Sequence, residues 1–214
     1  MKQGIIFDMD GTLWDSSENV AKSWDAVVQT QAGGIRKITT KDIQNVMGHT
    51  MTEIAQLLFP MLSLKEAVKL TDRCGEAENE YLRRHGGVLY PDLEETLQVL
   101  EKRYPLYIVS NCQQGYIEAF LEYYQFWHYF KDIECFGNNG RDKAYNIALV
   151  VRRNQLADAV YVGDIQGDYD SSVKAGVKFI HAAYGFGSVD GEVSSIQRFA
   201  ELADTGLVEG VLGD

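Results

Sequence analysis

The chain has 214 residues, of which 45% are hydrophobic, and it carries a formal net charge of -11. This acidic balance disfavours a nucleic-acid backbone or an anionic membrane surface as a partner, because both attract positive charge. No apolar run reaches the length of a membrane-spanning helix, and the N-terminus leads directly into a predicted core strand rather than a signal peptide.

The first fourteen residues contain a predicted buried strand that ends in two carboxylates. Residues 4–7 form a short apolar run typical of a parallel sheet, and Asp8 and Asp10 follow it directly. Residues two apart on an extended backbone point to the same face, and Gly11 allows a sharp turn after them. Two carboxylates this close are unfavourable unless a cation or a proton lies between them, so the pattern indicates a metal site.

Residues 15–88 have a different character and predict a helical module. Apolar residues recur at helical spacing from Val20 to Val28, and two glycines at 33 and 34 end this first helix. Further helix starts are expected near residues 39, 50 and 63, the last with a capping box of Ser63 and Glu66. No convincing strand occurs in this stretch, so we interpret it as a helical insertion after the first strand.

The chain then alternates between strands and helices. Asp92, with Glu95, is expected to cap a helix. Four more strands are predicted at 106–109, 133–136, 159–162 and 177–181, with helices between them, a loop at 138–143 and a helix-like tail over 196–202. This alternation predicts a doubly wound parallel α/β sheet, formed by residues 1–14 and 89–214, with residues 15–88 as an inserted helical cap. A two-stranded hinge is expected near residues 14–16 and 86–90.

Polar side chains follow the ends of these strands. Ser110 and Asn111 come after the second strand, Lys143 after the third, and Asp164 and Asp168 after the fourth. All should meet with Asp8 and Asp10 at the carboxyl edge of the sheet. Four carboxylates and one lysine call for a divalent ion, and an oxygen-rich set without His or Cys suits Mg²⁺ rather than zinc. Together, Mg²⁺, a lysine and a serine are suited to binding a phosphate group.

With these motifs in order, the sequence resembles the phosphatase branch of the haloacid dehalogenase-like hydrolase superfamily. The matching segments are residues 8–12 (DMDGT), Ser110-Asn111, Lys143, the Gly163-Asp164-x-x-x-Asp168 pattern, and residues 183–187 (AYGFG). The helical insertion is similar to the four-helix cap of the phosphoglycolate phosphatase and β-phosphoglucomutase subgroup. The chain departs from the subgroup at Asp92, where many relatives have glycine, and after Lys143, where proline is common.

The resemblance implies roles for these residues. Asp8 would attack phosphorus and form an aspartyl phosphate, while Asp10 would act as acid and base and offer its backbone carbonyl to Mg²⁺. Asp164 would be a direct metal ligand, and Asp168 would act through water or by supporting the ligands. Ser110 and Lys143 would bind the transferring phosphoryl group. Substrate contacts are expected from Thr12 and Asn111 and, in the cap, from His49 and Thr50, although a surface role for the two cap residues stays open.

The expected activity is Mg²⁺-dependent hydrolysis of a small soluble phosphate monoester, by a cytoplasmic monomer or homodimer. Hydrolytic dehalogenases of the superfamily lack the second carboxylate, so Asp10 argues against that chemistry. A phosphomutase of the β-phosphoglucomutase type is the nearest alternative, and Thr12 leans towards hydrolysis because those mutases often carry a Val-like residue there. A non-catalytic binding member is the other alternative, but the chain retains every motif residue.

The remaining polar and reactive residues carry no clear signal. The three cysteines, Cys74, Cys112 and Cys135, have neither metal-site nor disulfide-framework spacing, and we expect them to be reduced. An aromatic run from Phe120 to Phe130 is expected to pack in the core rather than stack on a ligand.

Overall fold

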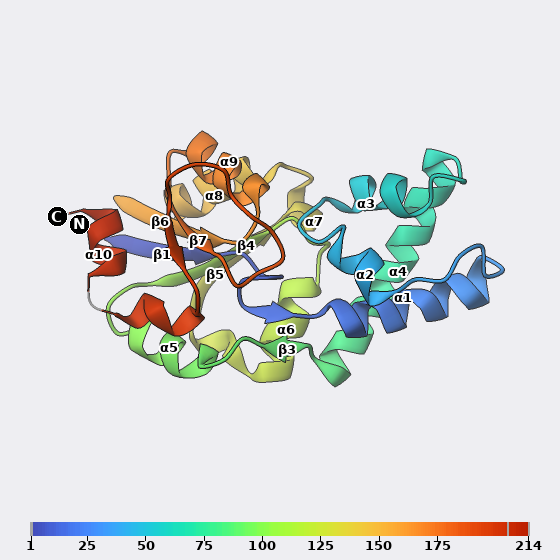
Figure 1. Cartoon of the computed structure of the whole chain (residues 1–214), viewed down its shortest axis with the longest axis horizontal. Coiled ribbons are helices and arrows are strands. Elements are labelled where there is room, and N and C mark those ends of the chain that lie inside the picture. The colour runs from blue at the N-terminus through green and yellow to red at the C-terminus, as the bar shows by residue number, and fades with distance from the viewer. Residues whose placement is uncertain (1, 205, 214) are drawn as a thin grey trace.

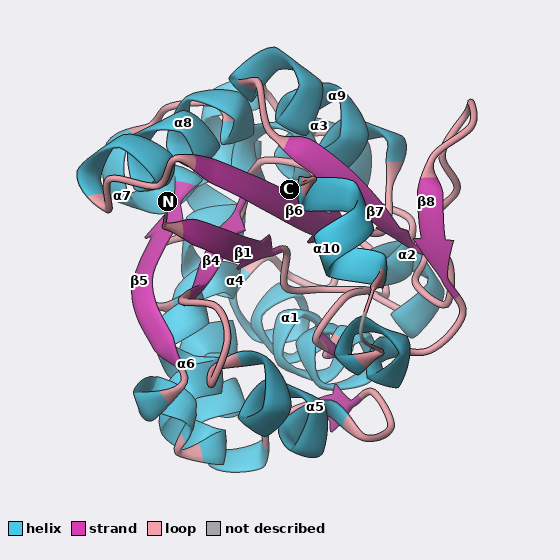
Figure 2. Ribbon diagram, turned by 90° about the vertical axis from the view of Figure 1, so that its left-hand side faces the viewer, coloured by secondary structure: helices cyan, strands magenta, loops and turns pink. Residues whose placement is uncertain are grey.

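The computed structural model describes residues 2–204 and 206–213. At its centre is a six-stranded sheet (Figures 1 and 2). Its neighbouring strands all run parallel, in the order β5-β4-β1-β6-β7-β8. They are β1 (Gln3–Phe7), β4 (Leu106–Ser110), β5 (Phe130–Cys135), β6 (Asp158–Gly163), β7 (Lys178–Ala182) and β8 (Ser194–Ile196). The chain builds outward from β1 in both directions, which confirms the predicted doubly wound α/β fold.

Helices cover both faces of this sheet, so β1 is a central strand without solvent on either side. Ile5 and Phe7 pack into one buried cluster and Ile6 into another, because successive strand residues point to opposite faces. This double burial explains the continuous apolar run of β1. The helices of this part are α5 (Leu93–Leu100), α6 (Tyr116–Tyr124), α7 (Phe136–Asn139), α8 (Lys143–Arg153), α9 (Gln166–Ala175) and α10 (Leu207–Leu212), with 3-10 turns η1 (Phe126–His128) and η2 (Phe199–Ala203).

A group of four helices lies at the end of the molecule opposite both termini (Figure 1). The helices are α1 (Ser17–Gln31), α2 (Thr40–Gln44), α3 (Met51–Leu58) and α4 (Leu64–His85). They are connected to the sheet by two short strands, β2 (Trp14–Asp15) and β3 (Val88–Leu89), which pair in antiparallel fashion. These paired strands lie where the two-stranded link was expected, near residues 14–16 and 86–90.

Capping boxes begin three of these four helices. In each, a Ser or Thr side chain accepts a hydrogen bond from a backbone N–H three residues later, and an acidic side chain bonds back to the first residue. The pairs are Thr39 with Asp42, Thr50 with Glu53, and Ser63 with Glu66. The predicted start of the long helix at Ser63 is thus confirmed. By contrast, Ser16 precedes α1 without a side-chain capping bond, so its hydroxyl is available for another contact.

Asp92 does not cap the helix that follows it, and that prediction was wrong. Its φ of 59° places the backbone in the left-handed region, where the side chain makes no capping hydrogen bond to α5. Glycine adopts this conformation without the steric cost that a Cβ atom brings. The backbone geometry is therefore a physical reason for the glycine of the family pattern at this position.

Two further stretches differ from expectation. The tail predicted to be helical over 196–202 contains the end of edge strand β8 and the 3-10 turn η2. A short apolar run fits the periodicity of a helix or of a strand, and pairing with β7 makes residues 194–196 a strand. The predicted loop at 138–143 begins inside the short helix α7, whose end is marked by Gly140 in a left-handed conformation.

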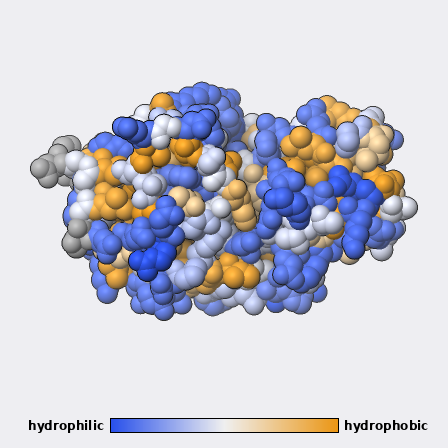
Figure 3. All heavy atoms as spheres, in the orientation of Figure 1, coloured by the Kyte–Doolittle hydropathy of each residue, from blue (hydrophilic) through white to orange (hydrophobic). Residues whose placement is uncertain are grey.

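Much of the visible surface is hydrophilic, with apolar residues interspersed and gathered over the α3–α4 end of the helical group (Figure 3). Leu57, Met61 and Leu64 are among the large hydrophobic residues exposed in that region. Among the described helices, none combines the length and the apolar character needed to cross a membrane.

Candidate active site

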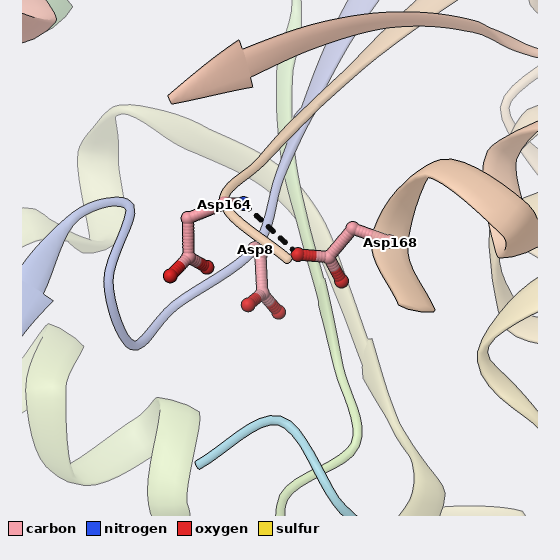
Figure 4. A group of neighbouring side chains, drawn as sticks. All are labelled: Asp8, Asp164 and Asp168. Atoms are coloured by element: carbon pink, nitrogen blue, oxygen red, sulfur yellow. Dashed lines mark hydrogen bonds between the residues drawn. The ribbon is translucent and has the colours of Figure 1, made fainter. Parts of the chain in front are cut away.

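Three carboxylates from two distant parts of the chain meet at the carboxyl edge of the sheet (Figure 4). Asp8 follows β1, Asp164 follows β6, and Asp168 lies in the first turn of α9. One oxygen from each lies within 4.8 Å of those of the other two, and all three side chains are buried. Figure 4 shows the carboxyl groups of Asp8 and Asp164 side by side and pointing in the same direction. The fold thus brings together these three of the predicted site residues.

Lys143 supplies the positive charge of this cluster. It is the first residue of α8, is only 3% exposed, and donates to Asp8 at 2.9 Å and to Asp168 at 2.5 Å. Burial opposes its charged form, but the Asp168 and Asp8 carboxylates outweigh this and raise the pKa of Lys143. The lysine is therefore held as a cation beside the first carboxylate of the chain.

One lysine does not balance three carboxylates. Burial, reinforced by the charge of Asp168, raises the pKa of Asp8 to about 7 despite the opposing effect of Lys143. Burial and the same neighbour, followed by Asp8, raise the pKa of Asp164 well above its usual range. This excess of negative charge, carried by hard oxygen ligands, fits a bound divalent cation.

The backbone around the cluster leaves no space for larger residues. Gly11 has a φ of +80°, and a Cβ atom there would lie 2.1 Å from an oxygen of Asp164. At Gly163, an added Cβ would lie 2.5 Å from an oxygen of Asp168. These two glycines allow the loops after β1 and β6 to pass close to the acidic side chains, and this gives the glycines of both motifs a physical reason.

Both carboxylate oxygens of Asp168 accept hydrogen bonds from other groups of the protein. One accepts from Lys143, and the other accepts from the backbone N–H groups of Asp164 and Ile165 at 3.0 and 3.3 Å. The first of these backbone bonds is the dashed line in Figure 4. Asp164 in turn accepts from the backbone N–H of Phe186 at 2.7 Å. Asp168 therefore orients Lys143 and the turn that carries Asp164.

Asp10 lies apart from this trio, at the boundary with the helical group. Its carboxylate accepts from the Ser16 hydroxyl at 2.8 Å and from the Tyr116 hydroxyl at 2.6 Å. Burial raises the pKa of Asp10 to about 6, although both hydrogen bonds oppose the shift. A carboxyl group with this pKa exchanges protons readily near neutral pH, as a general acid and base must.

Three other predicted residues border the same region. Ser110 is buried at the end of β4 and lines a cavity beside Asp10. Asn111 donates from its amide to the backbone carbonyl of Gly48 at 2.9 Å and so links the sheet to the helical group. Within the described part of the chain, the buried Thr12 hydroxyl and the Asn111 carbonyl oxygen have no hydrogen-bond partner. Unpaired buried polar atoms are costly, which is consistent with a bound ligand satisfying them.

The two predicted cap residues have different surroundings. His49 lines the cavity but is half-exposed, with its ring nitrogen 3.7 Å from Glu53. The Thr50 hydroxyl donates to Glu53 at 2.8 Å and accepts from its backbone N–H, as the cap of α3. The Thr50 side chain is thus occupied at the helix start, and the structure does not bring it to the cavity wall.

A cavity of about 50 Å³ separates the helical group from the sheet. The sheet side contributes Asp10, Ser110 and Asn111, and the helical side is mostly apolar. Since one water molecule needs roughly 10–15 Å³ in this measure, the space accommodates about four heavy atoms. A small chemical group beside Asp10 is what this cavity can hold.

Sequence reasoning missed several polar residues of this site. Tyr161 donates to Asp8 at 3.3 Å and to the Val109 carbonyl at 2.7 Å, while Tyr116 and Glu78 line the cavity. Tyr161 stands in a buried strand and Glu78 in the middle of a helix. Neither position carries a local pattern that distinguishes a site residue from a core or surface residue.

Comparison with known proteins gives a consistent assignment. The model of the family described as haloacid dehalogenase-like hydrolase matches residues 5–182. The phosphoglycolate phosphatase of Vibrio vulnificus is 26% identical over 220 residues, covering 95% of this chain and 96% of its own. The phosphoglycolate phosphatase of Aliivibrio fischeri is 26% identical over 198 residues, covering 85% of this chain and 84% of its own.

Solved structures share the fold. A haloacid dehalogenase-like family hydrolase from Streptococcus pneumoniae superposes with a TM-score of 0.77 at 22% identity, covering 94% of this chain and 96% of that one. CbbY from Rhodobacter sphaeroides, in complex with phosphate, gives a TM-score of 0.78 at 16% identity, covering 98% of this chain and 100% of that one. From the family match across most of its length, we conclude that this chain belongs to the haloacid dehalogenase-like hydrolases, on their phosphatase branch.

Proposed function

We propose that this protein is a Mg²⁺-dependent phosphatase that hydrolyses a small phosphate monoester through an aspartyl phosphate on Asp8. The observation that carries the proposal is the position of Asp8, between the Lys143 ammonium group and the Asp164 carboxylate at the carboxyl edge of the sheet. Ligands bind at this edge in open α/β sheets.

Asp8 is oriented for attack by the residues around it. Lys143 and Tyr161 both donate to its Oδ1, and no described residue donates to Oδ2. We assign the attack on phosphorus to this carboxylate: an O–P bond forms, and the bond from phosphorus to the leaving oxygen breaks. Asp10 gives its proton to the leaving oxygen, then takes a proton from the water that attacks the aspartyl phosphate. The products are the alcohol and inorganic phosphate, with Asp8 and Asp10 restored.

The proposed ligands of Mg²⁺ are Asp8, Asp164 and the backbone carbonyl of Asp10, with Asp168 supporting them through its bonds to Lys143 and the turn after β6. A bound ion supplies charge neutralisation for the carboxylates and the phosphoryl oxygens. Lys143 and Ser110 bind the phosphoryl group, and the Thr12 hydroxyl adds a donor that has no partner within the described chain.

Residues 15–88 act in this proposal as a cap over the site. Asn111 joins the sheet edge to Gly48, and Asn79 of α4 donates to the backbone carbonyl of Gln114 at 2.8 Å. These contacts bring apolar side chains of the cap against the cavity beside Asp10, which excludes bulk water. Asn111 and His49 are the proposed contacts for the rest of the substrate, and Thr50 is not carried forward because its hydroxyl caps α3. We further propose that the enzyme works in the cytoplasm as a monomer or homodimer, to be tested by cell fractionation and light scattering.

The decisive experiment is the Asp8→Asn variant, assayed by phosphate release from aryl and small alkyl phosphates with and without Mg²⁺. We expect turnover to be lost in this variant and to require Mg²⁺ in the natural protein. Asp170→Asn is the matched control, because Asp170 is an exposed carboxylate of α9 that bonds only to Gln166 among the described residues. Unchanged turnover in Asp8→Asn would refute the mechanism, and an isomerised sugar phosphate from a hexose 1-phosphate would indicate a mutase instead.

A further inference from the structure

The cap presents a single buried carboxyl group to the cavity beside Asp10. Glu78 lies in the middle of α4, is only 4% exposed, and lines this cavity. Most of the cap side of the wall is apolar: Val20, Trp24, Ile43, Val46, Met47, Met51 and Ile54. The mechanism proposed above does not use Glu78, so its burial needs another explanation.

Glu78 is held in place from two directions. Its carboxyl group accepts a hydrogen bond from the indole Nε1 of Trp24, which ties α4 to α1. Burial first, then the nearby charge of Asp10, raises the pKa of Glu78 to about 8, while hydrogen bonds with Trp24 and Gln113 oppose the shift. A glutamine would make the same tie to Trp24 without an acidic group. Packing alone therefore does not account for a carboxyl group at this position.

The cavity contains no counter-charge for an anionic ligand. Among the described residues that line it, there is no lysine or arginine, and His49 is half-exposed and pairs with Glu53. A negatively charged leaving group beside Asp10 would meet a second acid and lose its own hydration without a cationic partner. Glu78 is protonated near neutral pH, but an ammonium group at the same place would favour its ionised form and pair with it, and a hydroxyl group would find a hydrogen-bond partner in either form.

We propose that Glu78 is a specificity-determining residue that selects phosphate esters of small amino alcohols and polyols and rejects esters whose leaving group carries a carboxylate. This inference rests on the phosphatase function proposed above. It predicts that the substrate of this chain differs from phosphoglycolate, the compound in the names of its curated relatives. The cavity has room for about four heavy atoms of the leaving group and is partly open, so a larger leaving group can extend beyond it.

A matched series of two-carbon esters tests the proposal. In O-phosphoethanolamine and 2-hydroxyethyl phosphate the second carbon carries an ammonium or a hydroxyl group, and in 2-phosphoglycolate it is the carboxylate carbon. For the natural protein we expect kcat/KM to be at least about 10-fold higher with the first two than with phosphoglycolate, because burying an unpaired charge is costly. At about pH 9, where Glu78 is ionised in the folded protein, Glu78→Gln should raise kcat/KM for phosphoglycolate about 10-fold, lower it for phosphoethanolamine by a similar factor, and leave the hydroxyethyl ester least changed.

The control and the outcomes separate this inference from the proposed function. Glu76→Gln removes an exposed carboxylate from the same helix and should leave the order of the three substrates unchanged. If phosphoglycolate is the best substrate, or if Glu78→Gln lowers all three values equally, Glu78 does not select the leaving group. If the protein hydrolyses other esters but none of these three, the inference also fails, whereas no phosphate release from any ester refutes the phosphatase function itself. Should Glu78→Gln not fold, competitive inhibition of the natural enzyme by the same three esters gives the same comparison.

Discussion

Replacing Glu78 by glutamine should change how the stability of the protein depends on pH. Burial raises the pKa of this carboxyl group from an ordinary 4.5 to about 8 in the folded protein. Between these values the folded chain keeps a proton that the unfolded chain has lost, so the free energy of unfolding falls as the pH rises. Glutamine has the same shape and hydrogen-bonds to Trp24, but it has no proton to lose. The variant should therefore lack this part of the pH dependence.

The size of the effect follows from the two pKa values. Within the window, the slope is about 1.4 kcal/mol per pH unit. From about pH 5.5 to about pH 7.5, the natural protein should lose about 2.5 kcal/mol of stability relative to Glu78→Gln, allowing for partial ionisation near the upper limit. The titratable groups around Glu78 are Asp10, Cys74 and Tyr116, and they are present in both proteins. The difference between the two proteins therefore isolates Glu78.

Urea unfolding at constant ionic strength, with EDTA to remove divalent ions, measures this difference at several pH values. Glu76→Gln, in an exposed position of the same helix, controls for the change in net charge. Parallel stability curves for the natural protein and Glu78→Gln across the whole window would refute the conclusion that Glu78 is a neutral buried acid near pH 7. If the natural protein instead gained stability relative to Glu78→Gln as the pH rises, the predicted direction of the pH dependence would be wrong.

Three further variants test the site and the cap. Gly11→Ala places a Cβ atom against Asp164, so turnover should fall by about 100-fold and calorimetry should show weaker Mg²⁺ binding; unchanged binding would contradict the packing argument. Lys143→Met leaves Asp8 without its buried cation and should cost about 3–5 kcal/mol in urea unfolding near neutral pH. Mg²⁺ should restore part of that stability, and no response to the ion would argue against a cation site. Ser63→Ala removes a helix cap and should cost about 1 kcal/mol without changing kcat; a lower kcat would indicate that this helix end takes part in turnover.

Local patterns in the sequence predicted most of the fold. The apolar run of β1 is continuous because both faces of the strand are buried, and the Ser63 capping box depends only on residues within one helical turn. Polar residues after strand ends predicted the cluster of Asp8, Lys143 and Asp164, because parallel strands in one sheet carry their carboxyl ends to the same edge.

Predictions failed where a distant contact or an unusual backbone conformation decides the structure. Asp92 was expected to cap α5 because aspartate is a common capping residue, but its backbone has a positive φ and its side chain makes no capping hydrogen bond. The stretch predicted to be helical over 196–202 begins in strand β8, which pairs with β7.

What the sequence determined by itself is the chemistry at the strand ends, since the acids and the serine directly follow or closely trail their strands and Lys143 opens the helix after the third. Only the tertiary structure decided what surrounds that chemistry. Lys143 reaches Asp8 across 135 positions of the chain, and Tyr116 reaches Asp10 across 106. Glu78 meets the site only because α4 packs over the sheet edge. Contacts between residues so far apart in the chain produce no local sequence pattern in either segment. The surroundings of the leaving group could therefore be identified only from the tertiary structure.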